Sequence, residues 1–254
     1  MIGFFRKIRK KLADDNKPLK YLRYAIGEIV LVVIGILIAL QINNWNTHKQ
    51  ETKELHNHLK NIQNNLRGDL ISMEEARIFR DSSRSHSQTY LRIANKDEIT
   101  IDDFSMIENS DYKAYYDLNF EPRTSGFETL KNSGSIGKLS GTKIEVSLNE
   151  YYYLVGKIIE REKSFNHNVE TLENIAHSEN IQLRNFEIQY NTKNKEEYFS
   201  THQKELKELL NNPSMKSINF RNLGSDVIIH YYKQSEQLAN DLISEIDVLM
   251  GNQN

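Results

Sequence analysis

The sequence contains no cysteine and only 3 prolines and 11 glycines among its 254 residues. The absence of cysteine excludes disulfides, thiolate nucleophiles and cysteine-ligated zinc sites. Proline and glycine interrupt helices most strongly, so their scarcity, together with abundant Leu, Ile, Glu, Lys, Asn and Gln, favours long helices over sheets. We therefore predict an all-α fold.

The chain also lacks an excess of charge of one sign. Its formal net charge is −2 at pH 7, and the basic residues beyond the N-terminal leader are interspersed with acidic ones. Proteins that bind nucleic acids carry a clustered basic face to neutralise phosphates. We therefore predict no nucleic-acid partner.

Motifs that carry catalysis or bind cofactors are missing as well. A phosphate-binding loop at the Gly-Lys pair of SGSIGKLSGTK would need a glycine where Asn132 precedes the stretch, and a Ser or Thr where Leu139 stands. There is no GxSxG and no HExxH, and His56 and His58, two apart on a helix, point in nearly opposite directions. We therefore predict a protein that is not an enzyme, with no metal site, no cofactor and no catalytic residue; a hydrolase is not expected, because no nucleophile and base pair can be named.

One stretch stands out by what it contains. YAIGEIVLVVIGILIALQINNW, residues 24–45, has Glu28 as its only charged side chain. As a helix it would be about 32 Å long at ~1.5 Å per residue, close to the ~30 Å apolar thickness of a bilayer. Tyr24 and Trp45 stand at its ends, where interfacial aromatic belts form. This pattern predicts a transmembrane helix over residues 24–45.

The flanks of this stretch predict its orientation. The leader, residues 1–23, carries 8 Lys and Arg residues against two Asp residues, whereas the segment after Trp45 is balanced. Positive flanks stay in the cytoplasm, so residues 46–254 are expected on the far side, in the periplasm of a bacterial inner membrane. A cleaved signal peptide has the same order, but no small-x-small site follows LIALQINNW, which favours an uncleaved anchor. The leader segment FFRKIRKKL is amphipathic and suited to lie on anionic membrane lipid.

Two features inside the predicted span are candidate functional elements. An ionisable residue in a membrane is by default a functional candidate, so Glu28 could couple to protons, or it could reach back to the interface or make a structural contact. Gly27, Gly35 and Ala39 form a small-residue face of the kind that packs transmembrane helices, which favours a homo-oligomer or a helix partner.

The opening blocks FFRKIRKKL and KYLRYAIGEIVLVVIGILIALQINNWN, and the later blocks RTSGFETLKNSGSIGKL and LNEYYYLV, resemble an uncharacterised family of single-span inner-membrane proteins from Gram-negative bacteria. The resemblance covers most of the chain. It implies an inner-membrane anchor with an extracytoplasmic helical domain. It carries no activity, ligand or catalytic residue over to this sequence.

Residues 46–254 are expected to form an extracytoplasmic antiparallel bundle. Apolar residues spaced three and four apart from Leu55 to Phe79 predict that the transmembrane helix continues to about Ala94, with the stripe of a bundle or coiled coil. Thr100 is expected to cap a short helix. The irregular residues 108–122 are expected to be a loop at the membrane-distal end.

Capping signals predict the remaining helices. Ser125 with Glu128, and Thr142 with Glu145, match the capping box, in which both side chains bond free backbone N–H groups. The first should open a short helix ending near Gly134, and the second a long helix ending near residue 185. A further helix is expected over about 195–210. A last one carries an apolar stripe of Val227, Tyr231, Leu238, Leu242, Ile246 and Leu249.

Tyrosine is the most unusual component of this domain. Tyr112, Tyr115 and Tyr116, with Phe120 and Arg123, form a candidate partner or ligand surface, since aromatic and Arg side chains dominate interfaces. Alternatively, the tyrosines pack the bundle core with their hydroxyls at its rim, and this reading also covers Tyr151, Tyr152, Tyr153, Tyr231 and Tyr232. Arg123 could bind an anion together with the N-terminus of the following helix, or could pair with Glu121 or Glu128.

These expectations together predict a non-enzymatic, membrane-anchored periplasmic helical bundle that acts as a scaffold, an assembly factor or a sensor input by binding a protein or small ligand. The alternative is a subunit of an ion-coupled membrane complex that uses Glu28. Replacing Glu28 with Gln distinguishes them, because it should abolish activity only under the alternative.

Overall fold

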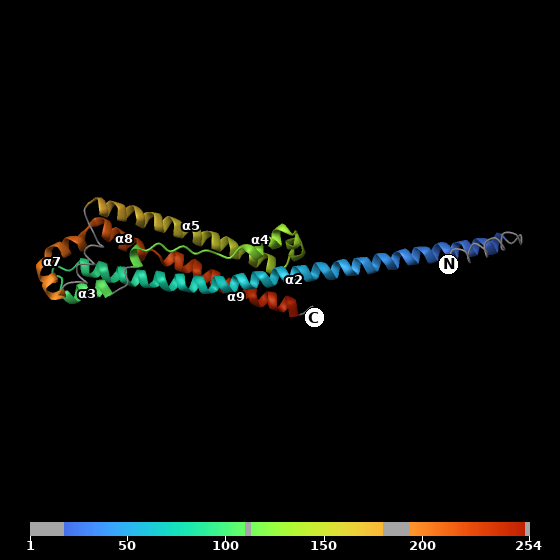
Figure 1. Cartoon of the computed structure of the whole chain (residues 1–254), viewed down its shortest axis with the longest axis horizontal. Helices are drawn as coiled ribbons and strands as arrows, with labels where there is room; N and C mark the ends of the chain where they lie inside the picture. The colour runs from blue at the N-terminus through green and yellow to red at the C-terminus, as the bar shows by residue number, and fades with distance from the viewer. Residues whose placement is uncertain (1–17, 110–112, 180–193, 252–254) are drawn as a thin grey trace. The chain divides into compact units, whose positions relative to one another are not determined.

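The computed structural model describes residues 18–109, 113–179 and 194–251 (Figure 1). Within these residues the secondary structure is helical and no strand occurs, which confirms the predicted all-α fold. Most of the basic leader, and Tyr112 of the candidate surface, lie outside the described residues.

The first helix, α2, runs from Pro18 to Ala94, so the predicted end near Ala94 is confirmed. Contacts divide the chain into two units, residues 1–57 and residues 58–254. In the first unit, α2 is long and apolar enough to cross a membrane, and no residue of its most apolar part is buried. At the end of this part, the Lys49 ammonium lies 5.4 Å from the centre of the Trp45 ring.

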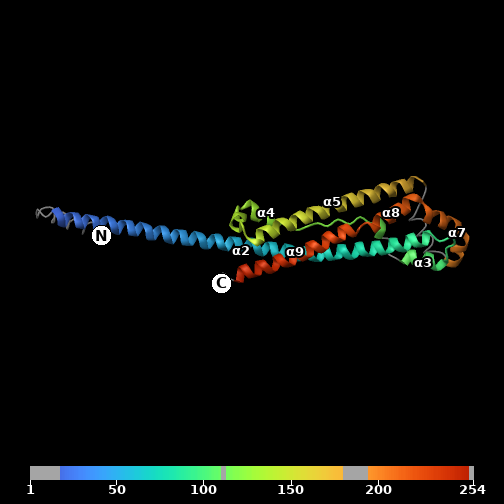
Figure 2. The same cartoon turned by 180° about the vertical axis from the view of Figure 1, so that it is seen from behind.

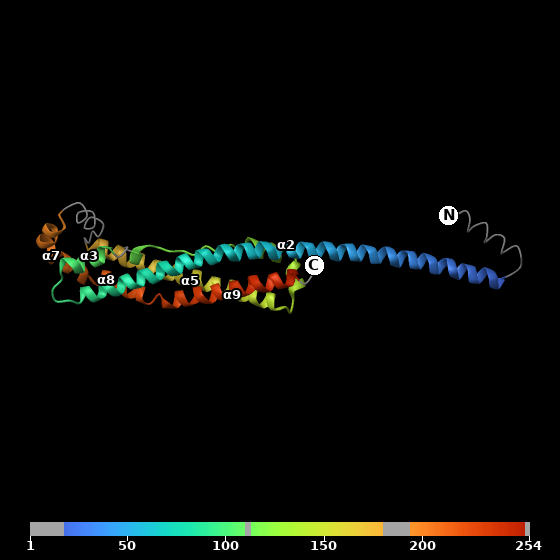
Figure 3. The ribbon, with the colours of Figure 1, turned by 90° about the horizontal axis from the view of Figure 1, so that it is seen from below.

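The second unit is a helical bundle. Beyond residue 58 of α2 it contains α3 (Ile101–Asn109), η1 (Lys113–Tyr115), α4 (Ser125–Asn132), η2 (Ser135–Leu139), α5 (Lys143–Ser178), α7 (Lys195–Asn211), α8 (Pro213–Leu223) and α9 (Asp226–Gly251). Figures 1 and 2 show α5 and α9 side by side, and Figure 3 shows α9 lying along α2.

The contacts between helices give their directions. The residues of α9 that contact α2 come in the reverse order along the chain. Gln63 donates to the Ile243 carbonyl, whereas Arg77, further along α2, pairs with Glu236, which comes earlier in α9. The bundle is therefore antiparallel at α9. In contrast, α5 runs in the same direction as α2, because the extended segment before α4 carries the chain back along the bundle (Figure 1).

Local capping chemistry explains where the helices begin. The Thr142 hydroxyl accepts the Glu145 N–H, and the Glu145 carboxylate accepts the Gly141 N–H, so this predicted cap of α5 is confirmed. The Thr100 hydroxyl likewise accepts the Asp103 N–H at the start of α3.

The other predicted capping box is wrong. Thr124 is the N-cap of α4 and makes no side-chain cap, and Ser125 is already inside the helix, where its hydroxyl accepts a hydrogen bond from Asn65. The reason is that Ser125 is held against α2 rather than left free to turn back on its own helix.

Two further boundaries differ from expectation. Helix α5 ends at Ser178 rather than near residue 185. Asn212 and Pro213 do end α7, but they also begin α8, which the sequence reasoning missed. Asn212 accepts the Met215 N–H, and Pro213 occupies the first turn, where its missing N–H costs nothing.

The core of the bundle mixes apolar stripes with charge. The stripe of α2 contains Leu59, Ile62, Leu66 and Met73, but Asp69 and Arg80 are buried in the same row. On α9 the buried stripe passes through Ile228, Tyr232, Ser235, Ala239, Leu242 and Ile246. The predicted stripe was wrong at its first two positions, because Val227 is exposed and Tyr231 is only half-buried, whereas the next residues, Ile228 and Tyr232, are buried.

Candidate functional site

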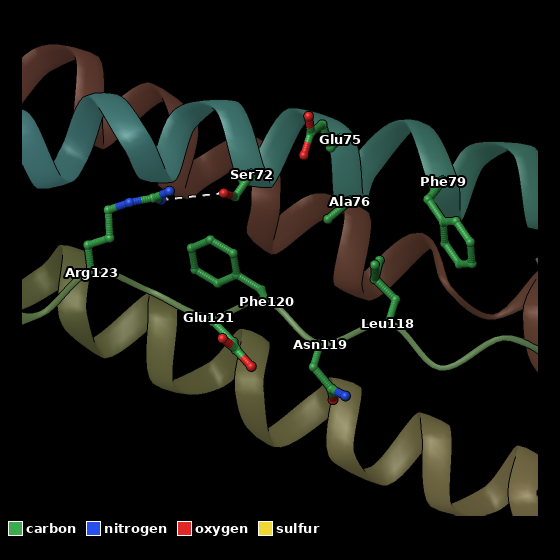
Figure 4. Close-up of a pocket in the computed structure, with 9 residues that line it drawn as sticks. All are labelled: Ser72, Glu75, Ala76, Phe79, Leu118, Asn119, Phe120, Glu121 and Arg123. Carbon is green, nitrogen blue, oxygen red and sulfur yellow. Dashed lines mark hydrogen bonds between the residues drawn. The ribbon is translucent and has the colours of Figure 1, made fainter.

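The segment from Tyr116 to Thr124, here called the strap, has no helix, turn or bend and lies between α2 and α5 (Figure 4). Its two ends contact Arg80 and Asp69, which are about 16 Å apart along α2 at ~1.5 Å per residue. From Leu118 to Arg123, an extended chain also covers about 16 Å at ~3.3 Å per residue. The strap is therefore fully extended along the bundle, not a loop at its end as the sequence suggested.

Asp69 of α2 holds one end of the strap. Its side chain is 0% exposed, and one carboxylate oxygen accepts the Arg123 N–H at 2.9 Å and the Arg123 guanidinium at 3.2 Å. The other oxygen accepts the Tyr151 hydroxyl at 2.9 Å. This one carboxylate thus joins α2, the strap and α5.

Glu162 of α5, together with Arg80, holds the other end of the strap in the same way. It accepts the Phe120 N–H at 2.6 Å and the hydroxyl of Tyr232 from α9. The Arg80 guanidinium lies 4.0 Å from the same carboxylate oxygen that receives Tyr232. Arg80 also donates to the Leu118 carbonyl at 3.2 Å. Both ions are almost completely buried, with exposed fractions of 1% each.

Asn166 of α5 completes this second cluster. Its amide nitrogen donates to the Leu118 carbonyl at 3.0 Å and to the Asn119 side chain at 3.1 Å, while its oxygen accepts from Arg80 at 3.3 Å. The Arg80 guanidinium lies 4.4 Å from the centre of the Phe165 ring, within cation–π range. The strap is thus fixed by side chains rather than by a β partner.

Burial shapes the electrostatics of both clusters. Burial raises the pKa of the Asp69 and Glu162 carboxyls, although hydrogen bonds from the strap backbone and from tyrosine partly oppose the rise. Burial and the adjacent carboxylates raise the pKa of Tyr151 and Tyr232, so both hydroxyls stay protonated as donors. Burial also lowers the pKa of Arg80. Each buried carboxyl accepts at least two hydrogen bonds, which is what a buried charge requires.

Close packing at Gly68 lets Arg123 cross α2. A Cβ atom on Gly68 would lie 2.6 Å from the Arg123 Nε, closer than atoms can approach. Glycine at this position therefore leaves the space in which the guanidinium reaches Asp69. The same guanidinium also donates to the Ser72 hydroxyl at 3.4 Å (Figure 4).

A groove of about 470 Å³ runs along the strap beside α2. Figure 4 shows Leu118 and Phe120 of the strap directed toward α2, Phe79 of α2 extending toward the strap near Leu118, and Arg123 at one end, beside Phe120. Asn119 and Glu121 point away from α2. The groove is lined by Ser72, Glu75, Ala76, Phe79, Leu118, Asn119, Phe120, Glu121 and Arg123. Its volume lies in the range of small-molecule sites.

The structure brings only part of the predicted surface together. Arg123 and Phe120 line the groove, but Phe120 is buried, and Arg123 pairs with Asp69 rather than with Glu121 or Glu128. Tyr116 lies on the strap and is 59% exposed, and Tyr115 belongs to η1.

The expectation that core tyrosines keep their hydroxyls at the rim is wrong for Tyr151 and Tyr232. Both are 0% exposed, and their hydroxyls bond the two buried carboxylates. The residues that sequence reasoning missed are Asp69, Arg80 and Glu162. One signal was available for the two acids, because each lies at helical spacing between apolar residues: Asp69 between Leu66 and Met73, and Glu162 between Ile158 and Phe165.

The candidates of the first unit lie on α2. Gly27 and Gly35 have no side chain within 4 Å, and Ala39 is exposed, so this small-residue face is open. Glu28 is half-buried. Among the described residues, no group of three or more His, Cys, Asp or Glu side chains could hold a metal ion.

A model of a family described as "Family of unknown function (DUF6090)" matches residues 28–200. This range covers most of the chain, from the apolar part of α2 through the strap and α5. No curated protein and no solved structure matches the sequence.

Proposed function

The chain belongs to the DUF6090 family of unknown function, and from that premise we propose that it is a non-enzymatic, membrane-anchored protein whose extracytoplasmic bundle binds a partner at the groove beside the strap. In this role it acts as a scaffold, an assembly factor or a sensor input. The observation that carries the proposal is the groove, which lies against a segment that two buried carboxylates hold in place.

The apolar part of α2 supports the membrane anchor. Soluble proteins rarely expose continuous apolar patches larger than a few hundred Å². Here every large apolar side chain from Ile29 to Leu40 is about half exposed or more. A bilayer removes this surface from water, and the basic leader favours a cytoplasmic N-terminus with the bundle in the periplasm of an inner membrane.

The absence of cysteine makes this topology testable in intact cells. The side chain of Lys204 on α7 is 91% exposed, so Lys204→Cys introduces a single accessible thiol. Spheroplasts treated with a membrane-impermeant maleimide should label this variant, and alkaline carbonate should leave the protein in the membrane pellet. Labelling only after lysis would contradict the proposed topology.

Charge reversal in the groove tests the binding site. Glu75→Arg with Glu121→Arg changes two exposed lining residues and should reduce recovery of native partners in a mild-detergent pull-down of the full-length protein. The matched control is Glu205→Arg with Glu208→Arg on α7, which makes the same change of charge outside the groove. Equal recovery by both double variants would overturn the proposal.

The alternative function, in an ion-coupled membrane complex, is favoured by one observation. Glu28 is the only charged residue between Tyr24 and Trp45. Under the alternative, Glu28→Gln should lose a membrane partner that the groove variant keeps. Under the proposed function, Glu28→Gln should keep its partner and the groove variant should lose it.

A further inference from the structure

The strap has two different backbone edges. In an extended chain, the N–H and C=O of one residue point to one side and those of the next residue to the other. The Leu118 carbonyl and the Phe120 N–H face the buried side chains of Arg80, Asn166 and Glu162. By this alternation the backbone groups of Asn119 and Glu121 face the opposite side, away from these three side chains. The alternation ends before Arg123, since the N–H of that residue turns back to the buried Asp69 carboxylate.

This outer edge is open. Within the described residues, no backbone hydrogen bond is made to the peptide groups of Asn119 or Glu121, and both residues are exposed. An extended segment with a free row of N–H and C=O groups is a template for pairing with another extended chain. Most such edges belong to sheets, whereas here buried side chains hold a single segment in the extended form.

The charges beside this edge are acidic. Glu75 on α2 and Glu121 on the strap are exposed carboxylates that line the groove, and Asp117, further along the strap, is exposed as well. The one cation that lines the groove, Arg123, is already paired with Asp69. Lysine or arginine side chains in an occupant would therefore be attracted to the rim, while apolar side chains would pack against Phe79 and Leu118, which line the groove (Figure 4).

Resting on the proposed function of the groove, we propose that its occupant is an extended, basic segment of a partner protein, which pairs its backbone with the outer edge of the strap at Asn119 and Glu121. Main-chain hydrogen bonds provide affinity that depends little on sequence. The acidic rim and the apolar groove select Lys or Arg residues alternating with apolar ones.

The test uses the full-length chain in detergent micelles and fluorescence anisotropy. The probe is an eight-residue peptide that alternates Lys and Val. One control peptide replaces Lys with Glu, and a second carries an N-methyl group on every peptide nitrogen, which keeps its charges but removes its N–H donors. At low ionic strength the Lys peptide should bind at least about tenfold more tightly than either control.

Two variants of one residue isolate the strap's contribution. Glu121→Ala removes the carboxylate and keeps the N–H, whereas Glu121→Pro removes both. The inward bond of Phe120 to Glu162 is left in place in both variants. Glu121→Pro should therefore bind the Lys peptide about fivefold more weakly than Glu121→Ala, the factor expected for one lost hydrogen bond.

The outcomes separate this inference from the proposed function. Absence of binding, equal binding of the N-methylated peptide, or equal binding of the Glu peptide would overturn the extended basic occupant. If the peptide results overturned this inference but Glu75→Arg with Glu121→Arg still reduced recovery of the native partner in the pull-down, the proposed function would stand without the inference. If the Lys peptide bound as expected but the groove variant recovered as much native partner as the control variant, the proposed function would fail instead.

Discussion

The two carboxylates that hold the strap make nearly the same bonds in different surroundings. Asp69 and Glu162 each accept one strap N–H and one tyrosine hydroxyl. They differ in their cation: the Arg123 side chain beside Asp69 is 49% exposed, whereas the Arg80 side chain beside Glu162 is 1% exposed. Water can therefore replace a lost partner at the first end of the strap but not at the second.

This difference separates the roles of the two ends. The cluster around Glu162 lies inside the bundle and joins α2, the strap, α5 and α9, so it fixes the fold. The cluster around Asp69 reaches the surface through Arg123, which also lines the groove. The Asp69 end is thus the one where a bound partner could affect the strap.

The largest effect on stability is expected when the buried pair of Arg80 and Glu162 is broken. Glu162→Gln leaves Arg80 charged, buried and without a carboxylate, which should lower the free energy of unfolding by about 3–5 kcal/mol. Urea denaturation of the full-length protein in detergent micelles, followed by circular dichroism, measures this loss. The double variant Arg80→Met with Glu162→Gln removes both charges and should recover part of it. A loss below about 1 kcal/mol, within the range of a single neutral hydrogen bond, would contradict a buried ion pair here.

Breaking the Asp69 end of the strap should lower the free energy of unfolding by less. Asp69→Asn keeps an oxygen that accepts from the strap, and the half-exposed Arg123 guanidinium can turn to water. We expect a loss of about 1–2 kcal/mol, measured in the same way. If Asp69→Asn destabilised the protein as much as Glu162→Gln, exposure of the cation would not be what distinguishes the two ends.

The raised pKa values of both carboxyls predict an unusual pH dependence. Above the ordinary pKa values of 3.8 and 4.5, the folded state holds these protons more tightly than the unfolded state does. Their contribution to stability is therefore present at low pH and is lost as the pH rises through the folded-state values. The loss is about 1.4 kcal/mol for each tenfold difference in proton affinity between the folded and unfolded states.

Comparing the wild type with a variant of each carboxyl isolates the contribution of that carboxyl to the pH dependence of stability. Asp103 acts in the opposite direction, because its hydrogen bonds to Lys96 and Thr100 lower its pKa despite burial. Subtracting the pH–stability curve of Asp69→Asn or Glu162→Gln from that of the wild type removes Asp103 from the comparison. Each difference should show the wild type losing stability relative to the variant as the pH rises above the ordinary carboxyl value. A difference with the opposite slope would show that the pKa of that carboxyl is lowered.

The helices could be predicted from the sequence because their signals are local. The Thr142 cap uses groups within a few residues of one another, and the apolar stripe of α2 repeats at three and four residues up to Met73. The prediction failed where the hydrogen-bond partner is distant in the sequence. Ser125 matched the capping box, but Asn65, 60 residues away in the sequence, binds its hydroxyl.

The strap could not be predicted for the same reason. Phe120 and Glu162 are 42 residues apart and Arg123 and Asp69 are 54 apart, so neither contact leaves a periodic trace. Arg80 resembles an ordinary surface charge on a helix, because Arg77, Ser83 and Arg84 lie three or four residues from it and charged residues are rarely buried unless they are paired. Arg123 was identified as a site residue from its neighbourhood, but its partner was not.

The smallest net effect is expected at Gly68, where two contributions oppose each other. Gly68→Ala should stabilise α2 by up to about 1 kcal/mol, because alanine favours helix. The new Cβ would displace the Arg123 guanidinium from Asp69, a half-exposed pair worth at most about 1 kcal/mol. The free energy of unfolding should therefore stay within about 1 kcal/mol of the wild type. In an Arg123→Ala background the atoms nearest to the new Cβ are gone, so the same substitution should be clearly stabilising. A large loss in the wild-type background alone would mean that Arg123 cannot move, and that both ends of the strap are equally rigid.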